Sequence, residues 1–205
     1  NVTGVQTCAL PILLDAGQLV SLRERLDRSN AWVDGRVTAG YQGAPTKFNQ
    51  QIDERSETAI VCQRIVGEAL ERHPLFISAV LPNTIYPPMF NRYSEGMKFG
   101  PHVDGSIRLH PHDGRKIRTD VSATLFLTNP DDYDGGELLI EDTYGLHKGD
   151  VPKTPRLLGW VRYGLYNNVT ANEDNPAGPV PHAVGAGRIP DTPRHRFMNR
   201  LLVEP

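Results

Sequence analysis

The stretch Val121-Ser-Ala-Thr-Leu-Phe-Leu-Thr128 decides the fold class, because its residues alternate with a period of two. Successive side chains of a β-strand point to opposite faces of the sheet. One face would carry Val121, Ala123, Leu125 and Leu127, and the other would carry Ser122, Thr124, Phe126 and Thr128. The pattern therefore predicts a strand with an apolar face.

Further strands are predicted on both sides of this stretch. Residues 136–141 follow a turn-forming segment and predict the next strand. Residues 89–93 and 98–103 predict two strands joined by Ser94-Glu-Gly96, which has the length of a hairpin turn.

The region before these strands contains a short apolar run at residues 75–81, which we interpret as a strand. Pro87 and Pro88 have no backbone N–H to donate, so we expect an edge strand or a bend there. Residues 40–51 are polar and are expected to form a loop.

Two helices are expected nearer the N-terminus. Asp15 can cap a helix that runs to about residue 28, and Ser56 can cap a second one. Their apolar stripes would consist of Leu19, Leu22 and Leu26 in the first helix, and of Ile60, Ile65, Val66, Ala69 and Leu70 in the second. Two helices followed by consecutive short strands predict an α+β fold with an antiparallel sandwich or barrel as its core.

Composition narrows the class of protein. The chain has 205 residues and a formal net charge of −2, which argues against partners such as nucleic acid or a membrane surface. No apolar run approaches the length of a membrane span. With only Cys8 and Cys62, a disulfide framework and a thiolate metal cluster are excluded. We expect a reducing, cytoplasmic setting.

The chain divides into three parts on sequence grounds. Residues 1–12 resemble a translated sequencing-library adapter and are excluded from the fold. Residues 13–148 carry the strand and helix patterns and form the expected domain. Residues 149–205 are rich in proline and glycine and lose the strand pattern. They can be interpreted as a long surface-loop region or as an aberrant, frameshifted or chimeric tail, and the abrupt loss of the pattern favours the second interpretation.

The sequence His102-Val-Asp104 is the central candidate site. If it lies on a strand, residues i and i+2 point to the same face, so the imidazole and the carboxylate project together. Such a pair is two thirds of the facial triad of non-haem iron(II) oxygenases, which leaves coordination positions open. The flanking Gly100 and Gly105 fit a strand end.

A third ligand would have to come from elsewhere in the chain. His182 and His195 have the right order, although both lie in the tail. The other histidines have simpler interpretations: His73 as a helix C-terminal cap, His110 and His112 as loop residues, and His147 as a residue too close to a preceding strand.

A 2-oxoglutarate cosubstrate would also need a cation for its distal carboxylate. Arg188 and Arg194 follow His182 in the sequence, whereas Arg92 and Arg118 lie at strand edges and could serve a substrate or the sheet. Tyr93 could donate to a cosubstrate carboxylate or be structural.

Several motifs together resemble the bacterial PKHD-type hydroxylases, relatives of prolyl 4-hydroxylase. The motifs include Trp32-Val-Asp-Gly-Arg36, Pro88-Met-Phe-Asn-Arg-Tyr93, Phe99-Gly-Pro-His-Val-Asp-Gly105, Arg118-Thr-Asp-Val-Ser-Ala-Thr-Leu-Phe-Leu127 and Tyr133-Asp-Gly-Gly-Glu-Leu138. The resemblance implies a double-stranded β-helix (jelly roll) with N-terminal helices packed on it. It also implies Fe(II), the cosubstrate 2-oxoglutarate and L-ascorbate, with His102 and Asp104 as the first two metal ligands.

The resemblance also implies an activity. The expected function is that of an Fe(II)- and 2-oxoglutarate-dependent dioxygenase, which uses O2 to hydroxylate an unactivated C–H bond of peptidyl proline or of a small molecule. A homo-oligomer is compatible with this function, and the oligomeric state stays open.

The chain departs from the family after residue 148. The family's third ligand lies in a Ser-Leu-His-x-Val-Thr-Pro stretch, but the corresponding region here reads Gly164-Leu-Tyr-Asn-Asn-Val-Thr170. Tyr166 stands about where the histidine is expected, and no arginine follows at the family spacing. One alternative is therefore a catalytically inactive jelly-roll binding module, and another is a cupin-like metal enzyme that does not use 2-oxoglutarate.

Overall fold

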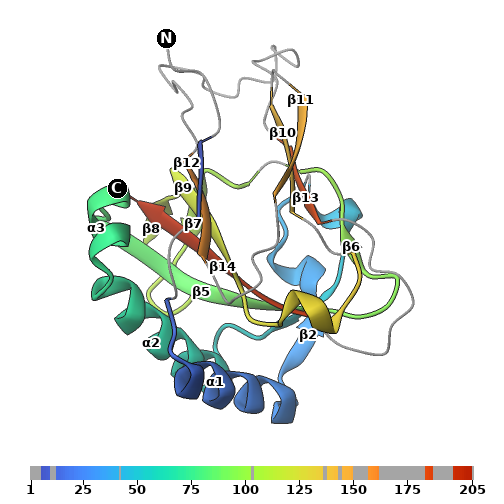
Figure 1. Cartoon of the computed structure of the whole chain (residues 1–205), viewed down its shortest axis with the longest axis horizontal. Helices are drawn as coiled ribbons and strands as arrows, with labels where there is room; N and C mark the ends of the chain where they lie inside the picture. Colours follow the sequence, from blue (N-terminus) through green and yellow to red (C-terminus); the bar gives the residue numbers. More distant parts are fainter. Residues whose placement is uncertain are drawn as a thin grey trace.

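The computed structural model describes residues 6–9, 13–41, 43–102, 104–135, 138–142, 145–149, 157–161, 183–186 and 196–204. These residues contain helices and antiparallel sheets, as the α+β prediction requires. The α-helices gather on one side of the larger sheet, and the smaller sheet lies apart from them (Figure 1).

Both predicted helices are confirmed, and both begin at the predicted caps. The side chain of Asp15 accepts a hydrogen bond from the backbone N–H of Gln18 at the start of α1 (Ala16–Arg28). Ser56 accepts from the N–H of Ala59 at the start of α2 (Glu57–Glu71). These caps satisfy N–H groups that have no partner inside the helix.

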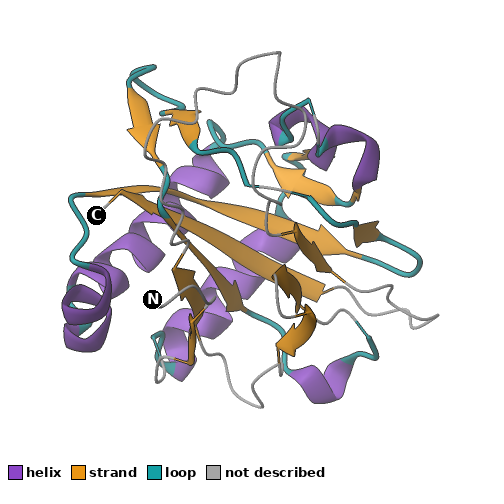
Figure 2. Cartoon of the chain, turned by 90° about the horizontal axis from the view of Figure 1, so that it is seen from above, coloured by secondary structure: helices purple, strands orange, loops and turns teal. Residues whose placement is uncertain are grey.

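The main hydrophobic core lies between the helices and the larger sheet. It contains apolar residues of α1 and α2 together with those of the central strands, among them Leu22, Leu26, Val66, Leu70, Phe90, Val121, Ala123 and Leu125. The predicted apolar faces of the helices and of the Val121 strand therefore meet in one core, except that Ile60, predicted in the stripe of the second helix, is exposed. Figure 2 shows helices running behind the long strands of this sheet.

The segment predicted as a strand at residues 75–81 is instead the helix α3 (Pro74–Val80). Its start is fixed by Pro74 in the first turn and by His73, whose Nδ1 accepts from the N–H of Phe76 at 3.1 Å. His73 is thus an N-terminal cap and not the predicted C-terminal one. The strand prediction failed because a short apolar run does not distinguish a strand from a helix.

The larger sheet has seven strands in the order β1-β12-β9-β14-β5-β4-β2. In that order they are β1 (Gln6–Ala9), β12 (Leu157–Val161), β9 (Val121–Phe126), β14 (Arg196–Glu204), β5 (Thr84–Tyr93), β4 (Gln50–Ile52) and β2 (Trp32–Asp34). Part of the N-terminal segment excluded from the fold on sequence grounds thus forms an edge strand, paired with β12. The strand predicted from the alternating stretch is therefore confirmed as β9, in the interior of this sheet.

The prediction of an edge strand or a bend at Pro87 and Pro88 is confirmed in part. Both prolines lie within β5, where they face β14 at a bulge, and the described pairing of β4 does not extend to them. The register shifts at this point: Met89 pairs with Arg200 and Tyr86 with Leu202, so the two prolines oppose Leu201 alone. Such a bulge interrupts the ladder where the prolines cannot donate. The described pairing of β4 reaches β5 only near residues 91 and 92.

The smaller sheet has five strands in the order β11-β10-β13-β6-β3, and a separate hairpin has two. The strands of the sheet are β11 (Gly145–Gly149), β10 (Leu138–Asp142), β13 (Ala183–Ala186), β6 (Lys98–Phe99) and β3 (Lys47–Phe48), and those of the hairpin are β7 (Ile107–Leu109) and β8 (Lys116–Arg118). The 3-10 helices are η1 (Gly35–Thr38), η2 (Ala44–Thr46) and η3 (Pro130–Asp132).

Three further expectations need correction. The turn at residues 94–96 exists, with Gly96 at a φ of 72°, but it joins strands of different sheets and not a hairpin. Residues 40–51 were expected to form a loop but contain η2, β3 and the start of β4. Residues 149–205 were expected to lack strands, yet β12, β13 and β14 lie there and pair within the two sheets.

None of the helices in the described part of the chain has both the length and the apolar character that a membrane crossing requires.

Candidate metal centre

His102 and Asp104 come together just beyond the end of β6. The expectation that they lie on the strand itself is wrong, because β6 ends at Phe99. Nevertheless the imidazole Nε2 of His102 lies 3.3 Å from Oδ1 of Asp104, and the two side chains are only 5% and 6% exposed. The residue between them, Val103, lies outside the described residues. The predicted pair is thus assembled in a buried place.

The tautomer of His102 follows from its other ring nitrogen. Nδ1 lies 2.7 Å from the backbone carbonyl oxygen of Gly100. A carbonyl can only accept, so Nδ1 donates, and in the neutral ring Nε2 then presents its lone pair. That lone pair lies beside the Asp104 carboxylate. Metal-binding histidines commonly show this arrangement, because a bond at one nitrogen orients the other toward the metal.

The Asp104 carboxylate is held from the larger sheet. Oγ of Ser122, on β9, donates to Oδ2 of Asp104 at 2.7 Å. One residue further along the loop, Gly105 accepts a hydrogen bond through its carbonyl from Oγ1 of Thr119. The candidate site therefore lies between the two sheets, on the face of β9 that points away from the helices.

These atoms suit a divalent cation. A neutral imidazole nitrogen and a carboxylate oxygen are a donor set that Fe(II) accepts. Two ligand atoms that are each about 2.1 Å from a metal lie about 3.0 to 3.4 Å apart for the common bond angles. The observed 3.3 Å falls in this range. Within the described ranges, however, no cluster of three or more His, Cys, Asp and Glu residues is found.

The candidates for the third ligand and for the cosubstrate cation fall mostly outside the described residues. Outside the described part of the chain lie Tyr166, His182, Arg188, Arg194 and His195. β13 nevertheless begins directly after His182 in the sequence, and its Ala186 pairs with Phe99 of β6, the strand that leads to His102.

The two arginines at strand edges, Arg92 and Arg118, contact other residues of the protein. The guanidinium of Arg92 lies over the Trp32 ring, 4.2 Å from its centre, and Nε donates to Gln50. Nε of Arg118 donates to Asp120 at 2.6 Å on the surface. Of the two roles predicted for these arginines, the structure therefore favours the structural one.

The remaining named residues are also placed. His110 lies in a turn, where its Nδ1 is 2.9 Å from the Asp113 carboxylate, and its ring meets His112 edge-on. Backbone donation from Arg115, followed by the influence of His110, lowers the pKa of Asp113. Tyr93 is buried near the end of β5, and His147 lies in β11. The polar loop predicted for His110 and His112 is thus confirmed.

Sequence reasoning missed a buried polar cluster beside the candidate site. Nζ of Lys47 donates to Oγ1 of Thr38 at 3.0 Å and to Oε1 of Gln51 at 2.9 Å. The same ammonium lies 5.2 Å from the centre of the Phe99 ring, and that ring stacks on His102. The polarity of residues 40–51 indicated a loop, whereas the polar side chains are turned inward.

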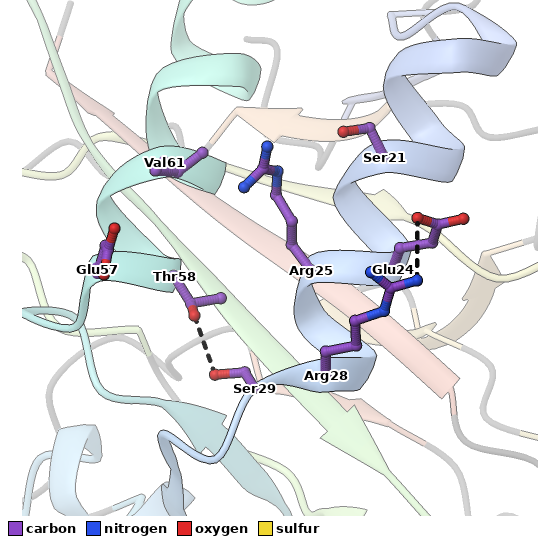
Figure 3. A pocket seen from close by; sticks show the side chains of 8 residues that line it. All are labelled: Ser21, Glu24, Arg25, Arg28, Ser29, Glu57, Thr58 and Val61. Carbon is purple, nitrogen blue, oxygen red and sulfur yellow. Dashed lines mark hydrogen bonds and ion pairs between the residues drawn. The ribbon is translucent and has the colours of Figure 1, made fainter.

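A separate cleft of about 380 Å³ lies between α1 and α2. Figure 3 shows Arg25 reaching into it, with the ion pair of Glu24 and Arg28 at its side. Its lining residues belong to the two helices and their ends, which cover the apolar face of β9 and not the face that carries Ser122. It is therefore distinct from the site around His102.

The chain has close relatives among curated proteins. It is 74% identical over 139 residues to a PKHD-type hydroxylase of Cupriavidus metallidurans, a match that covers 67% of this chain and 61% of that protein. It is 59% identical over 144 residues to a PKHD-type hydroxylase of Paraburkholderia phymatum, with 70% and 63% covered. The chain thus spans about three fifths of the length of these relatives. No family model matches.

Solved structures share the fold at low sequence identity. A prolyl-4-hydroxylase of Pseudomonas putida matches with a TM-score of 0.59 at 16% identity, covering 100% of this chain and 94% of the other. A Trichoplax adhaerens prolyl hydroxylase, solved with a peptide fragment of hypoxia inducible factor, matches at 0.60 and 15%, with 96% and 82% covered. HygX from Streptomyces hygroscopicus, solved with nickel and 2-oxoglutarate, matches at 0.59 and 11%, with 98% and 83% covered.

The fold is therefore that of the prolyl hydroxylases and related 2-oxoglutarate oxygenases, with a buried His–Asp pair between its sheets. The resemblance predicted from the sequence motifs is confirmed, since the chain is homologous to PKHD-type hydroxylases over about two thirds of its length.

Proposed function

We propose that this chain is an Fe(II)- and 2-oxoglutarate-dependent dioxygenase that hydroxylates an unactivated C–H bond. The observation that carries the proposal is the buried pair of His102 Nε2 and Asp104 Oδ1, 3.3 Å apart and turned toward each other. The names of its relatives and the fold of its structural neighbours support the same chemistry. We further propose that the two sheets form a double-stranded β-helix around this pair.

His102 and Asp104 would hold the iron. When bound, the metal would bind 2-oxoglutarate and O2 and supply an oxidant strong enough to break a C–H bond. The protein would contribute a fixed imidazole tautomer, a fixed carboxylate and a site between two sheets from which water is largely excluded. L-ascorbate is proposed as the reductant that keeps the iron ferrous.

We propose His182 as the third ligand. It lies outside the described residues, and the support comes from its neighbour in the sequence, β13, which pairs with β6 just before His102. Arg188 and Arg194 are the candidates for the cation that binds the distal carboxylate of 2-oxoglutarate.

The substrate class follows only from the relatives. One structural neighbour is a prolyl hydroxylase bound to a peptide, and another, HygX, has been solved with hygromycin B. Peptidyl proline or a small molecule is proposed accordingly. Residues 13–148 are proposed as the portion that carries the homologous domain, and residues 149–205 as a tail that departs from the family's sequence pattern.

The proposal is tested by anaerobic titration of the purified chain with Fe(II) and 2-oxoglutarate. A visible metal-to-ligand charge-transfer band is expected on addition of both, and no band is expected in Asp104→Ala. Absence of the band in the unmodified chain would refute a complete centre and favour the inactive binding module. Translating the parent DNA in its other two reading frames would then show whether residues 149–205 result from a shift of the reading frame.

A further inference from the structure

The hydrogen bond between Ser122 and Asp104 gives the two carboxylate oxygens different environments. We propose that Ser122 is a positioning residue of the metal centre, which restricts Asp104 to binding the metal through Oδ1 alone. The inference rests on the proposed metal-dependent function, and it concerns how many coordination positions the protein leaves open.

The direction of the bond is set by chemistry. An ionised carboxylate has no proton to give, so the hydroxyl of Ser122 donates to Oδ2, here at 2.7 Å. The other oxygen, Oδ1, lies 3.3 Å from Nε2 of His102. One oxygen is therefore engaged by the protein, while the other lies where a metal held by His102 would meet it.

This division matters because a carboxylate can bind a metal through one oxygen or through both. In a facial triad the carboxylate contributes one position, so that three of six remain for cosubstrate and oxygen. A charge-assisted hydrogen bond to Oδ2 opposes chelation through both oxygens, since chelation would weaken that bond. Ser122 would thus preserve an open position on the metal.

Ser122 is itself rigidly placed. It lies on β9, between β12 and β14 in the larger sheet, and is 5% exposed. Its neighbours Val121 and Ala123 belong to the hydrophobic core on the opposite face. A hydroxyl held in this way can fix the carboxylate that it contacts.

A second contact ties the loop after Asp104 to the start of the same strand. The backbone N–H of Thr119 donates to the carbonyl of Ser106 at 2.9 Å, and its hydroxyl donates to the carbonyl of Gly105. Together with Ser122, these bonds fix three consecutive residues, 104 to 106. The carboxylate is thus held by its backbone as well as by its side chain.

The experiment is a titration of the full chain with Co(II) alone, monitored by its visible absorption spectrum. Ser122→Ala is expected to bind Co(II) about 10- to 100-fold more weakly than the unmodified chain, the range typical for loss of an outer partner of a metal ligand. It should also shift the Co(II) d–d bands, because the second carboxylate oxygen becomes free to coordinate. Ser122→Thr keeps the hydroxyl and should restore both affinity and spectrum.

Thr124→Val is the matched control. Thr124 is buried on the same face of β9, two residues further on, and its change also removes a hydroxyl from that strand. It should leave the Co(II) spectrum unchanged. Ser122→Val, which has the shape of the Ser122→Thr variant without its hydroxyl and favours a strand, provides a second variant if Ser122→Ala does not fold.

The outcomes distinguish a failure of the positioning role from a failure of the proposed metal-dependent function. Unchanged Co(II) affinity and spectrum in a folded Ser122→Ala or Ser122→Val, with binding abolished in Asp104→Ala, would overturn the positioning role and leave the proposed function intact. An unmodified chain that takes up no Co(II) would overturn the proposed function and the positioning role with it.

Discussion

The ring of Phe99 lies flat against the imidazole of His102, with ring centres 3.5 Å apart and planes inclined by 10°. Phe99 is the last residue of β6 and is buried, so the strand end carries a flat apolar surface against which the imidazole rests. Together with the bond from Nδ1 to Gly100, this contact leaves the imidazole little freedom to rotate.

Phe99→Leu is therefore expected to weaken metal binding by several-fold while the fold is kept. Leucine retains most of the buried apolar volume but cannot present a flat face to the imidazole. Co(II) titration measures the effect, and thermal unfolding monitored by circular dichroism controls for stability. Affinity equal to that of the unmodified chain would show that the Gly100 bond alone orients His102.

The third-ligand proposal makes a distinct prediction. His182→Ala should weaken Co(II) binding as severely as Asp104→Ala does, whereas His195→Ala should leave it unchanged, because only His182 directly precedes β13. The same titration measures all three variants. If His195→Ala shows the loss instead, the assignment of the two tail histidines must be exchanged.

Gly35→Ala should destabilise the fold. A Cβ at this position would lie 1.8 Å from Oδ1 of Asn49 and 3.0 Å from Cε of Lys47. Asn49 cannot move away freely, because its Nδ2 donates to Asn91. Overpacking of this kind lowers the free energy of unfolding by about 1 to 3 kcal/mol. In a chain of this size, each kcal/mol lowers Tm by about 2 to 4 °C.

Gly67→Ala is the control for this change. No atom lies within 4 Å of a Cβ built on Gly67, and the residue is inside α2. Alanine favours a helix over glycine by about 0.8 to 1 kcal/mol, so Tm should rise. A Gly35→Ala variant that melts no lower than the unmodified chain would mean that the side chains of Asn49 and Lys47 can move aside at little cost.

The Cys62 thiol predicts a loss of stability at alkaline pH. Burial raises its pKa from 9.0 to about 11, and the charge of Arg25 acts in the opposite direction. The unfolded chain therefore releases this proton first, and the contribution to stability is full below pH 9 and is lost as the pH rises toward 11. Urea unfolding between pH 8 and pH 11 measures this loss.

The contribution of Cys62 can be isolated by comparison with Cys62→Ala, in which the alkaline decline should be smaller. In a Cys8→Ser background, the native chain should also react slowly with Ellman's reagent at pH 8, because the thiol is buried and protonated. Rapid reaction in the native state would contradict the burial of Cys62.

Local sequence patterns determined the elements that depend on local chemistry. Asp15 and Ser56 begin helices because their side chains accept from N–H groups three residues on, an interaction within one turn of chain. The alternation around Val121 defined a strand because the side-chain period of a strand is a local property. The His102–Asp104 pair was likewise named from adjacent residues.

Other features depended on partners distant in sequence. The bulge that accommodates Pro87 and Pro88 exists only because β14 pairs with β5 there, more than a hundred residues away. Ser122 appeared as one member of a polar face, and only the approach of the loop after β6 gave that face a carboxylate to hold. In the sequence Lys47 is one residue of a polar segment, and only the position of β3 directs its ammonium inward to Thr38 and Gln51.

By itself, then, the sequence determined the two long helices, the alternating strand and the first two ligand candidates, because capping, periodicity and motif all act within a few residues. The tertiary structure alone decided that His102 and Asp104 meet beyond the strand and between two sheets, and which neighbours orient them. Those decisions depend on sheet pairing and burial, which bring together residues whose sequence separation carries no local signal.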